Sequence, residues 1–224
     1  MHDLSPRTAL VAGATGLVGG HVLRLLLADP DYQQVTVLAR RALPQAHPKL
    51  VTRVVDFDRL EEVTPFPRAQ DLFCCLGTTI RIAGSRDAFS KVDFTYVYDV
   101  ARLAARNGAA QLLLVTATGA NARSRIFYNR VKGKVEDAVR ALPLHGIHIF
   151  RPSLLLGERA ASRPGEGIAT AVSRAVQWAF VGPLARYRPI EGETVARAMV
   201  QVAKAGRSGA RVYESEEIGP LAAT

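Results

Sequence analysis

Residues 8–19 decide the fold and read TALVAGATGLVG, close to the start of the 224-residue chain. The first part of this stretch is apolar and β-branched and predicts a strand, and the apolar residues of 16–28 recur at near-helical spacing. Between them, Gly13, Gly16 and Gly19 follow one another at intervals of three. Such glycines allow a tight turn, a close backbone approach to a pyrophosphate and close packing of helix on strand. The helix then directs its N–H groups and the positive end of its dipole at the phosphates. We therefore predict a dinucleotide-binding loop, the alternative being a tight turn that binds nothing.

The alternation of strand and helix continues along the chain. Short apolar runs predict further strands at residues 34–39, 50–55, 71–75, 111–116, 148–151 and 211–214. Helical spacing and its terminators predict helices at residues 87–107, 126–141, 168–181 and 194–205. Strands that are apolar on both faces and alternate with helices form parallel sheets covered on both sides. We predict an α/β fold, a doubly wound parallel sheet in a single domain. Residues 8–151 would form the dinucleotide-binding core, and residues 152–224 a small cap over the crevice at the carboxyl ends of the strands.

The composition narrows the class of protein. Hydrophobic residues make up 48% of the chain and charged residues 22%, which excludes a mostly disordered chain, a collagen and a coiled coil. No stretch reaches the roughly 18 apolar residues of a membrane helix, and the first residues do not read as a secretory signal. We therefore expect a cytoplasmic protein with no membrane partner. The adjacent Cys74 and Cys75 would point to opposite faces of a strand, so we expect free, buried thiols.

The chain is basic, with 29 Lys and Arg against 20 Asp and Glu and a net charge of +9. The excess is dispersed, so we expect no nucleic-acid partner. A diffuse positive field favours anionic partners such as a phosphorylated cofactor. Among the five histidines only His145 and His148 lie close together in sequence, so we expect no metal site.

The end of the second predicted strand indicates which nicotinamide cofactor binds. NAD-specific proteins usually place an Asp or Glu there for the ribose 2′-hydroxyl. This chain has Arg40 and Arg41 after Ala39. A guanidinium can hold a 2′-phosphate and stack on adenine, so we predict a preference for NADP(H), with NAD(H) as the alternative cofactor. The other interpretation is a pair of solvated arginines.

Segments after three later strands are also predicted to meet the cofactor. The residues after the third strand would lie near the adenine, and the small residues after the fourth would let a ribose lie against the backbone. The backbone after the sixth strand could hold the carboxamide. The predicted cofactor contacts are Gly13, Thr15, Gly16, Leu17, Val18, Gly19, Arg40, Arg41, Asp56, Phe57, Leu76, Gly77, Thr78, Thr79, Lys132, Arg151, Pro152 and Ser153.

Tyr128 and Lys132 form the candidate catalytic pair. Four residues apart in a predicted helix, they share one face. A free tyrosine is a poor acid–base catalyst at neutral pH, but an ammonium one turn away favours the phenolate. Lys132 could also hydrogen-bond the nicotinamide ribose. Tyr128 would then protonate a carbonyl oxygen as hydride reaches the carbon, or carry out the reverse. The alternative is a Tyr packed on the sheet beside an exposed Lys.

A hydroxyl at the end of the fifth strand could bind the substrate oxygen. Thr116 lies at the carboxyl end of that strand and is our first candidate; Thr118 is the alternative, because residues two apart in an extended segment share a face. Both could also be β-favouring residues without a catalytic role.

Together these residues resemble the short-chain dehydrogenase/reductase superfamily, in its atypical and extended members. Residues 54–57 (VVDF), 73–79 (FCCLGTT), 128–136 (YNRVKGKVE), 150–155 (FRPSLL) and 162–166 (SRPGE) look like its Tat-interacting-protein (oxidoreductase) branch. The resemblance runs from about residue 8 to residue 214. It implies a Rossmann fold, bound NADP(H) and a Ser/Thr–Tyr–Lys catalytic set. By position Tyr128 and Lys132 match the pair, and Thr116 stands where the branch has a Ser.

The first functional hypothesis is an NADP(H)-dependent oxidoreductase acting on a small carbonyl or alcohol substrate. The second is a regulatory protein that binds the cofactor and a protein partner without turnover. A sugar-nucleotide epimerase or dehydratase ranks third, because few residues follow the sixth strand. A monomer and a homodimer are both compatible with the sequence. Residues 158–167 are a candidate lid, on which Arg159 and Arg163 could meet an anionic substrate.

Overall fold

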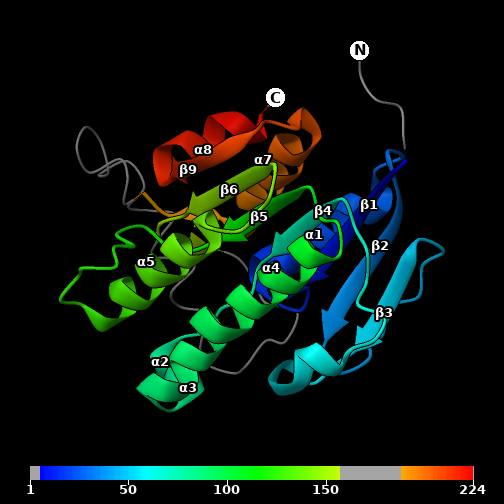
Figure 1. Cartoon of the computed structure of the whole chain (residues 1–224). Coiled ribbons are helices and arrows are strands. Elements are labelled where there is room, and N and C mark those ends of the chain that lie inside the picture. Colours follow the sequence, from blue (N-terminus) through cyan, green and yellow to red (C-terminus); the bar gives the residue numbers. More distant parts are fainter. Residues whose placement is uncertain (1–5, 157–187, 224) are drawn as a thin grey trace.

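The protein is built on one parallel sheet (Figure 1). The structure, a computed structural model, describes residues 6–156 and 188–223. From edge to edge the seven strands are β3 (Leu50–Val54), β2 (Tyr32–Ala39), β1 (Arg7–Ala12), β4 (Asp71–Cys74), β5 (Gln111–Val115), β6 (Gly146–Arg151) and β9 (Gly209–Glu214). Every neighbouring pair is parallel. The chain runs outward from β1 to β3, returns beside β1 at β4, and continues to the other edge. This reversal between β1 and β4 is the point at which doubly wound sheets open a crevice.

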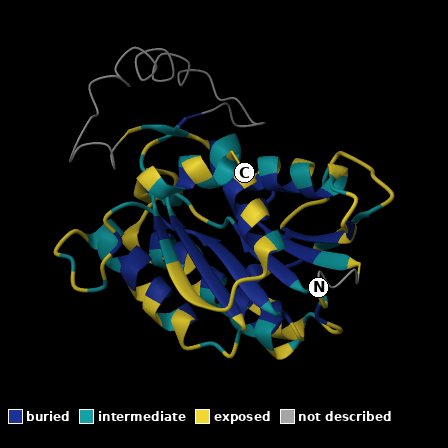
Figure 2. Ribbon diagram, turned by 90° about the horizontal axis from the view of Figure 1, so that it is seen from above, coloured by how far each residue is buried: buried dark blue, intermediate teal, exposed yellow. Residues whose placement is uncertain are grey.

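Helices cover both faces of the sheet, and each face encloses its own apolar core. The first face carries α1 (Leu17–Ala28), α7 (Gly192–Ala205) and α8 (Ser215–Ala222). The second carries α4 (Val97–Arg106), α5 (Phe127–Arg140) and the 3₁₀ helix η1 (Phe57–Glu62). Successive residues of β1 serve the two cores in turn, with Val11 in the first and Leu10 in the second. Figure 2 shows the buried strands between helices whose outer surfaces are exposed. The predicted doubly wound α/β fold is confirmed.

The predicted strands are all present, with small shifts at their ends. The predicted helix at residues 87–107 is divided into α3 (Arg86–Ser90), a π-helical segment η2 (Lys91–Tyr96) and α4. A π-helical turn is wider than an α-helical one and is common at functional sites. This one buries Asp93 completely. The helices η1, α2 (Ile80–Ala83) and α8 were not predicted.

The described residues after β6 belong to the same body as those before it. Two short strands, β7 (Leu155–Leu156) and β8 (Ile190–Glu191), pair with each other, β9 extends the sheet, and α7 packs against α1. The division into a core at 8–151 and a cap at 152–224 stays a prediction, and the predicted helix at 168–181 lies outside the described residues. No described helix is long and apolar enough to cross a bilayer.

The two cysteines are free, as predicted, but only Cys74 is buried and Cys75 is half-buried. Cys74 is fully buried in β4, and burial raises the pKa of its thiol to about 12. It is therefore an inert core residue at neutral pH.

The turn from β1 into α1 depends on glycine at two positions. Gly13 has a φ of +87°, and a Cβ there would lie 2.5 Å from the Cys75 carbonyl oxygen at the end of β4. A Cβ at Gly19 would lie 2.1 Å from the carbonyl oxygen of Gly13. Since real Cβ atoms do not approach backbone so closely, any side chain at either position would push α1 away from the sheet.

We predict that Gly19→Ala destabilises the protein by about 1–3 kcal/mol or more, because the added methyl overlaps the backbone of Gly13. Gly20→Ala is the matched control. It lies one residue along the same helix, where a Cβ would meet only the Ala14 carbonyl oxygen at 3.5 Å. It should be neutral or stabilising by up to about 1 kcal/mol. Urea unfolding of both variants checks the prediction, and equal stabilities would contradict the packing argument.

Candidate functional site

The candidate site lies at the carboxyl ends of β1, β4 and β5. The glycine turn after β1 forms its first part. Gly16 is the N-cap of α1, and the Gly16 N–H donates to the Gly13 carbonyl oxygen at 2.9 Å. No side chain of the described residues caps the first turn of α1, and no acidic residue lies in that turn. The N–H groups and the positive helix end are therefore open to an anion.

The other predicted contacts in this turn differ in exposure. Thr15 is exposed at the tip, Leu17 is half-buried, and Val18 points into the core. Only the backbone of Val18 is therefore available to a ligand.

The strands β2 and β3 lie on the β1 side of the reversal between β1 and β4, and the residues that follow them are on the same side as the glycine turn. Arg40 and Arg41 are exposed, and neither has an ion pair with a described residue. Asp56 accepts a hydrogen bond from the Asp58 N–H at 2.9 Å and so caps η1. Phe57 is buried against Tyr96, with ring centroids 5.5 Å apart. The predicted adenine contact at Phe57 would therefore come from its backbone.

The segment after β4 connects the glycine turn to the candidate catalytic pair. Its first residue, Cys75, lies against Gly13, and Gly77 lies beside Lys132. A Cβ at Gly77 would be 3.5 Å from Nζ of Lys132 and 3.4 Å from Oδ1 of Asp93. The Thr78 N–H donates to Oδ2 of Asp93 at 2.9 Å. Leu76 is half-buried against the second core, and the Thr79 hydroxyl caps α2.

Tyr128 and Lys132 lie one turn apart on α5. Tyr128 is half-buried, and its ring lies 5.4 Å from that of Phe89. Lys132 is almost completely buried, and its Nζ lies 2.7 Å from Oδ1 of Asp93. Lys132 is therefore not the exposed lysine of the alternative interpretation.

The environment keeps Lys132 charged. Burial alone would lower the pKa of Lys132, but the negative charge of Asp93 and the proximity of Tyr128 outweigh it, so this pKa is raised. Burial also raises the pKa of Asp93, against the opposing effects of Lys132 and the Thr78 N–H. The ammonium is thus held as a cation beside Tyr128.

The two threonines after β5 are held differently. The Thr116 hydroxyl donates to Oε1 of Glu136 at 2.7 Å and is only 6% exposed. The Thr118 hydroxyl donates to the Arg151 carbonyl oxygen at 3.0 Å and is half-buried. Thr116 therefore faces a buried ionic network, and Thr118 is the more accessible of the two.

That network ties β6 and β9 to α5. Arg151 donates from Nε to Oε1 of Glu136 at 3.0 Å and from Nη1 to Glu214 at 2.8 Å. Pro152 is buried and accepts a hydrogen bond from the Thr118 N–H. Ser153 bonds the Arg188 carbonyl oxygen through its hydroxyl and the Ser215 hydroxyl through its N–H. The structure thus uses the Arg151 side chain and both polar groups of Ser153 internally, and the role of these residues toward a nicotinamide remains a prediction.

Two buried acids, Asp93 and Glu136, were not singled out by the sequence. Glu136 follows Lys132 by one turn, so helical spacing placed it on the same face. Asp93 carried no comparable signal, because a polar residue in a predicted helix ordinarily faces solvent. The candidate lid at 158–167, with Arg159 and Arg163, lies outside the described residues. No cluster of metal-binding side chains occurs at residues 6–156 and 188–223.

Curated relatives cover most of this chain. It is 38% identical over 167 residues to the protein HTATIP2 of Rattus norvegicus, covering 73% of this chain and 69% of that protein. It is 33% identical over 204 residues to the mitochondrial protein FMP52 of Candida glabrata, covering 89% and 86%. The resemblance to the Tat-interacting-protein branch is confirmed.

The FMP52 relatives correct the expected location. FMP52 proteins of Candida glabrata, Emericella nidulans and Scheffersomyces stipitis are named as mitochondrial. The prediction of a cytoplasmic protein is therefore wrong. It rested on composition and on the lack of a secretory signal. Neither property distinguishes a cytoplasmic protein from a protein of another compartment that is reached without a secretory signal.

Solved structures share the fold. MoeE5 in complex with UDP-glucose and NAD superposes with a TM-score of 0.69 at 16% identity, covering 96% of this chain and 81% of MoeE5. The human epimerase family protein SDR39U1 with NADPH superposes with a TM-score of 0.62 at 18% identity, covering 92% and 74%.

A family model for NAD-dependent epimerases and dehydratases matches residues 9–213. That match spans β1 to β9 and therefore includes the glycine turn, the β4 end and α5. The chain belongs to the NAD-dependent epimerase/dehydratase family.

Proposed function

We propose that the protein is an NADP(H)-dependent oxidoreductase that moves hydride between the cofactor and a carbonyl or alcohol substrate, with Tyr128 as acid and base. One observation carries this proposal. The backbone from Cys75 to Gly77 contacts Gly13 at one end and the Lys132–Asp93 pair at the other. A cofactor whose pyrophosphate lies on the glycine turn would extend along this bare backbone toward Lys132.

The residues fit such a cofactor. Gly13 lets the turn lie against the backbone of Cys75, Gly77 presents no side chain beside Lys132 and Asp93, and the N-cap of α1 makes no side-chain hydrogen bond that would compete with a phosphate. Arg40 and Arg41 supply positive charge where NAD-specific proteins usually carry an acid, which supports NADP(H).

When bound, the nicotinamide would supply or accept the hydride. Tyr128 Oη would donate its proton to the substrate oxygen, and the buried Lys132 cation would stabilise the phenolate that remains. Thr118 would hold the same substrate oxygen, because it is the more accessible of the two threonines and its hydroxyl can turn from the Arg151 carbonyl oxygen to the substrate, whereas Thr116 is buried against Glu136. Asp93 acts through Lys132: it keeps the ammonium charged and fixes its position against the β4 end.

A nucleotide-sugar reaction is the second candidate. The family match and the neighbours with UDP-sugars and NAD favour it. It uses the same crevice, so UDP-glucose with NAD belongs in the substrate panel beside aldehydes, ketones and quinones with NADPH.

The cofactor preference is testable by fluorescence titration. We expect tighter binding of NADPH than of NADH, and we expect Arg40→Gln with Arg41→Gln to remove most of that preference. Two guanidinium contacts to a phosphate are worth about 1.5–3 kcal/mol each, or roughly tenfold or more in affinity. Arg197→Gln, an exposed change on α7, is the control and should leave both affinities unchanged. Failure to bind either cofactor would contradict the proposal.

Tyr128→Phe tests the acid–base role. It should keep NADPH affinity within about twofold and lower kcat by about 10²–10⁴, because only the transferred proton is lost. Tyr98→Phe is the matched control: this half-buried tyrosine on α4 stacks on Phe94, is not among the predicted site residues, and should retain activity. Turnover is followed by nicotinamide absorbance across the substrate panel. An active Tyr128→Phe enzyme would rule out Tyr128 as the proton donor.

Asp93→Asn tests the ion pair through its effect on stability. It leaves Lys132 buried without a carboxylate, so we expect a loss of about 3–5 kcal/mol at neutral pH. Burial then lowers the pKa of Lys132 in the folded state below its unfolded value. The folded state releases its proton first, and stability should rise with pH between about 7 and 9.

The wild-type protein should show no such rise, because the pKa of its Lys132 is raised and the cation persists throughout this range. Asp137→Asn, an exposed change on the same helix, should behave as wild type. Urea unfolding at several pH values measures these slopes. A pH-independent loss in Asp93→Asn would show that the carboxylate acts by shape and not by charge.

A further inference from the structure

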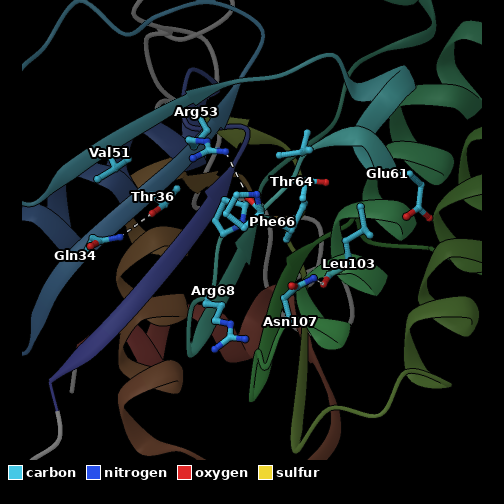
Figure 3. A pocket seen from close by; sticks show the side chains of 13 residues that line it. Gln34, Thr36, Val51, Arg53, Glu61, Thr64, Phe66, Arg68, Leu103 and Asn107 are labelled. Atoms are coloured by element: carbon cyan, nitrogen blue, oxygen red, sulfur yellow. Dashed lines mark hydrogen bonds between the residues drawn. The ribbon is translucent and has the colours of Figure 1, made fainter.

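The connection from β3 to β4 leaves part of the sheet uncovered. In place of a long crossover helix it holds only η1 and an extended segment at residues 63–68. A hollow of about 610 Å³ results, which we name the β3–α4 hollow. Its walls are β2 and β3, the segment 63–68, and the C-terminal end of α4 (Figure 3). The volume is in the range of small-molecule sites.

The base of this hollow is apolar and its rim is polar. Phe66 and Leu103 lie at its base and are 7% and 6% exposed. On the β2 wall, Nε2 of Gln34 donates to the Thr36 hydroxyl at 3.3 Å. A sheet face that is covered by a packed helix would carry apolar side chains at these positions.

Two cations on the rim have no carboxylate partner among residues 6–156 and 188–223. Arg53 is half-buried, and its one hydrogen bond to a described residue is a long one, 3.4 Å from Nη2 to the Pro65 carbonyl oxygen (Figure 3). Arg68 has no hydrogen bond or ion pair within the part of the chain that the structure describes. The carboxylate on the rim, Glu61, is already paired with Arg102. The guanidinium donors of Arg53 and Arg68 are thus available beside an apolar base.

We propose that the β3–α4 hollow binds a small amphipathic anion, with its carboxylate or phosphate against Arg53 and its apolar body over Phe66 and Leu103; Arg68 lies at the opposite end of the hollow (Figure 3). A guanidinium binds either oxyanion through paired N–H donors. None of the residues predicted to contact the cofactor lines this hollow. The proposal is therefore independent of the proposed function, and the two ligands would bind together.

Amide NMR titration of the full chain tests it, with decanoate, decyl phosphate and the neutral decanol as probes. We expect saturable shifts at residues 63–68 and 103–107 with either anion, and binding at least tenfold weaker with decanol. Tighter binding of decanoate or of decyl phosphate would identify the head group, and either order supports the site. Saturation with NADPH should leave the decanoate affinity unchanged.

Arg53→Gln should weaken anion binding about tenfold, the effect of one charge-assisted hydrogen bond, and Arg68→Gln, at the opposite end of the hollow, should weaken it less. Arg106→Gln, an exposed change near the end of α4 that does not line the hollow, should have no effect. Equal affinities in wild type and Arg53→Gln would overturn the proposal. So would displacement of decanoate by NADPH, or shifts that do not saturate.

Discussion

The close backbone approach at Gly13 and Gly19 is the constraint on which the rest of the structure depends. Gly19 brings the first turn of α1 onto the end of β1, and Gly13 brings the same turn against the end of β4. These contacts place a helix N-terminus at the reversal of the sheet, where a phosphate can meet it. They also align the β4 end with the glycine turn, so that the following residues lead directly to Lys132.

The second half of the site is organised by the buried face of α5. Tyr128, Lys132 and Glu136 follow one another at one-turn intervals along it. Lys132 pairs with Asp93 from the π-helical segment, and Glu136 pairs with Arg151 from β6. Both pairs are largely removed from water, so breaking either would leave an uncompensated charge. The two pairs therefore fix the position and orientation of α5 against the sheet, and with them the position of Tyr128 on this helix.

The sequence predicts the repetitive parts of this architecture well, because strand and helix periodicity are local properties. The glycine turn, the parallel order and the shared face of Tyr128 and Lys132 all follow from spacing. Contacts between residues that are far apart in the sequence do not follow from local spacing. Asp93 lies in a segment that reads as ordinary helix and reaches Lys132 only through the π-helical turn, and the attachment of Thr116 to Glu136 depends on how β5 and α5 pack. The β3–α4 hollow likewise arises because the connection from β3 to β4 leaves part of the sheet uncovered, and no local sequence pattern predicts an uncovered surface.

A crystal structure of the protein with NADPH would test the central claim most directly. We expect the pyrophosphate on the N–H groups of residues 17–19 and the nicotinamide ribose within hydrogen-bond reach of Lys132 Nζ, with the nicotinamide ring beside Tyr128. NADPH bound elsewhere, or in this crevice with its nicotinamide directed away from Lys132, would contradict the assignment of this crevice as a hydride-transfer site.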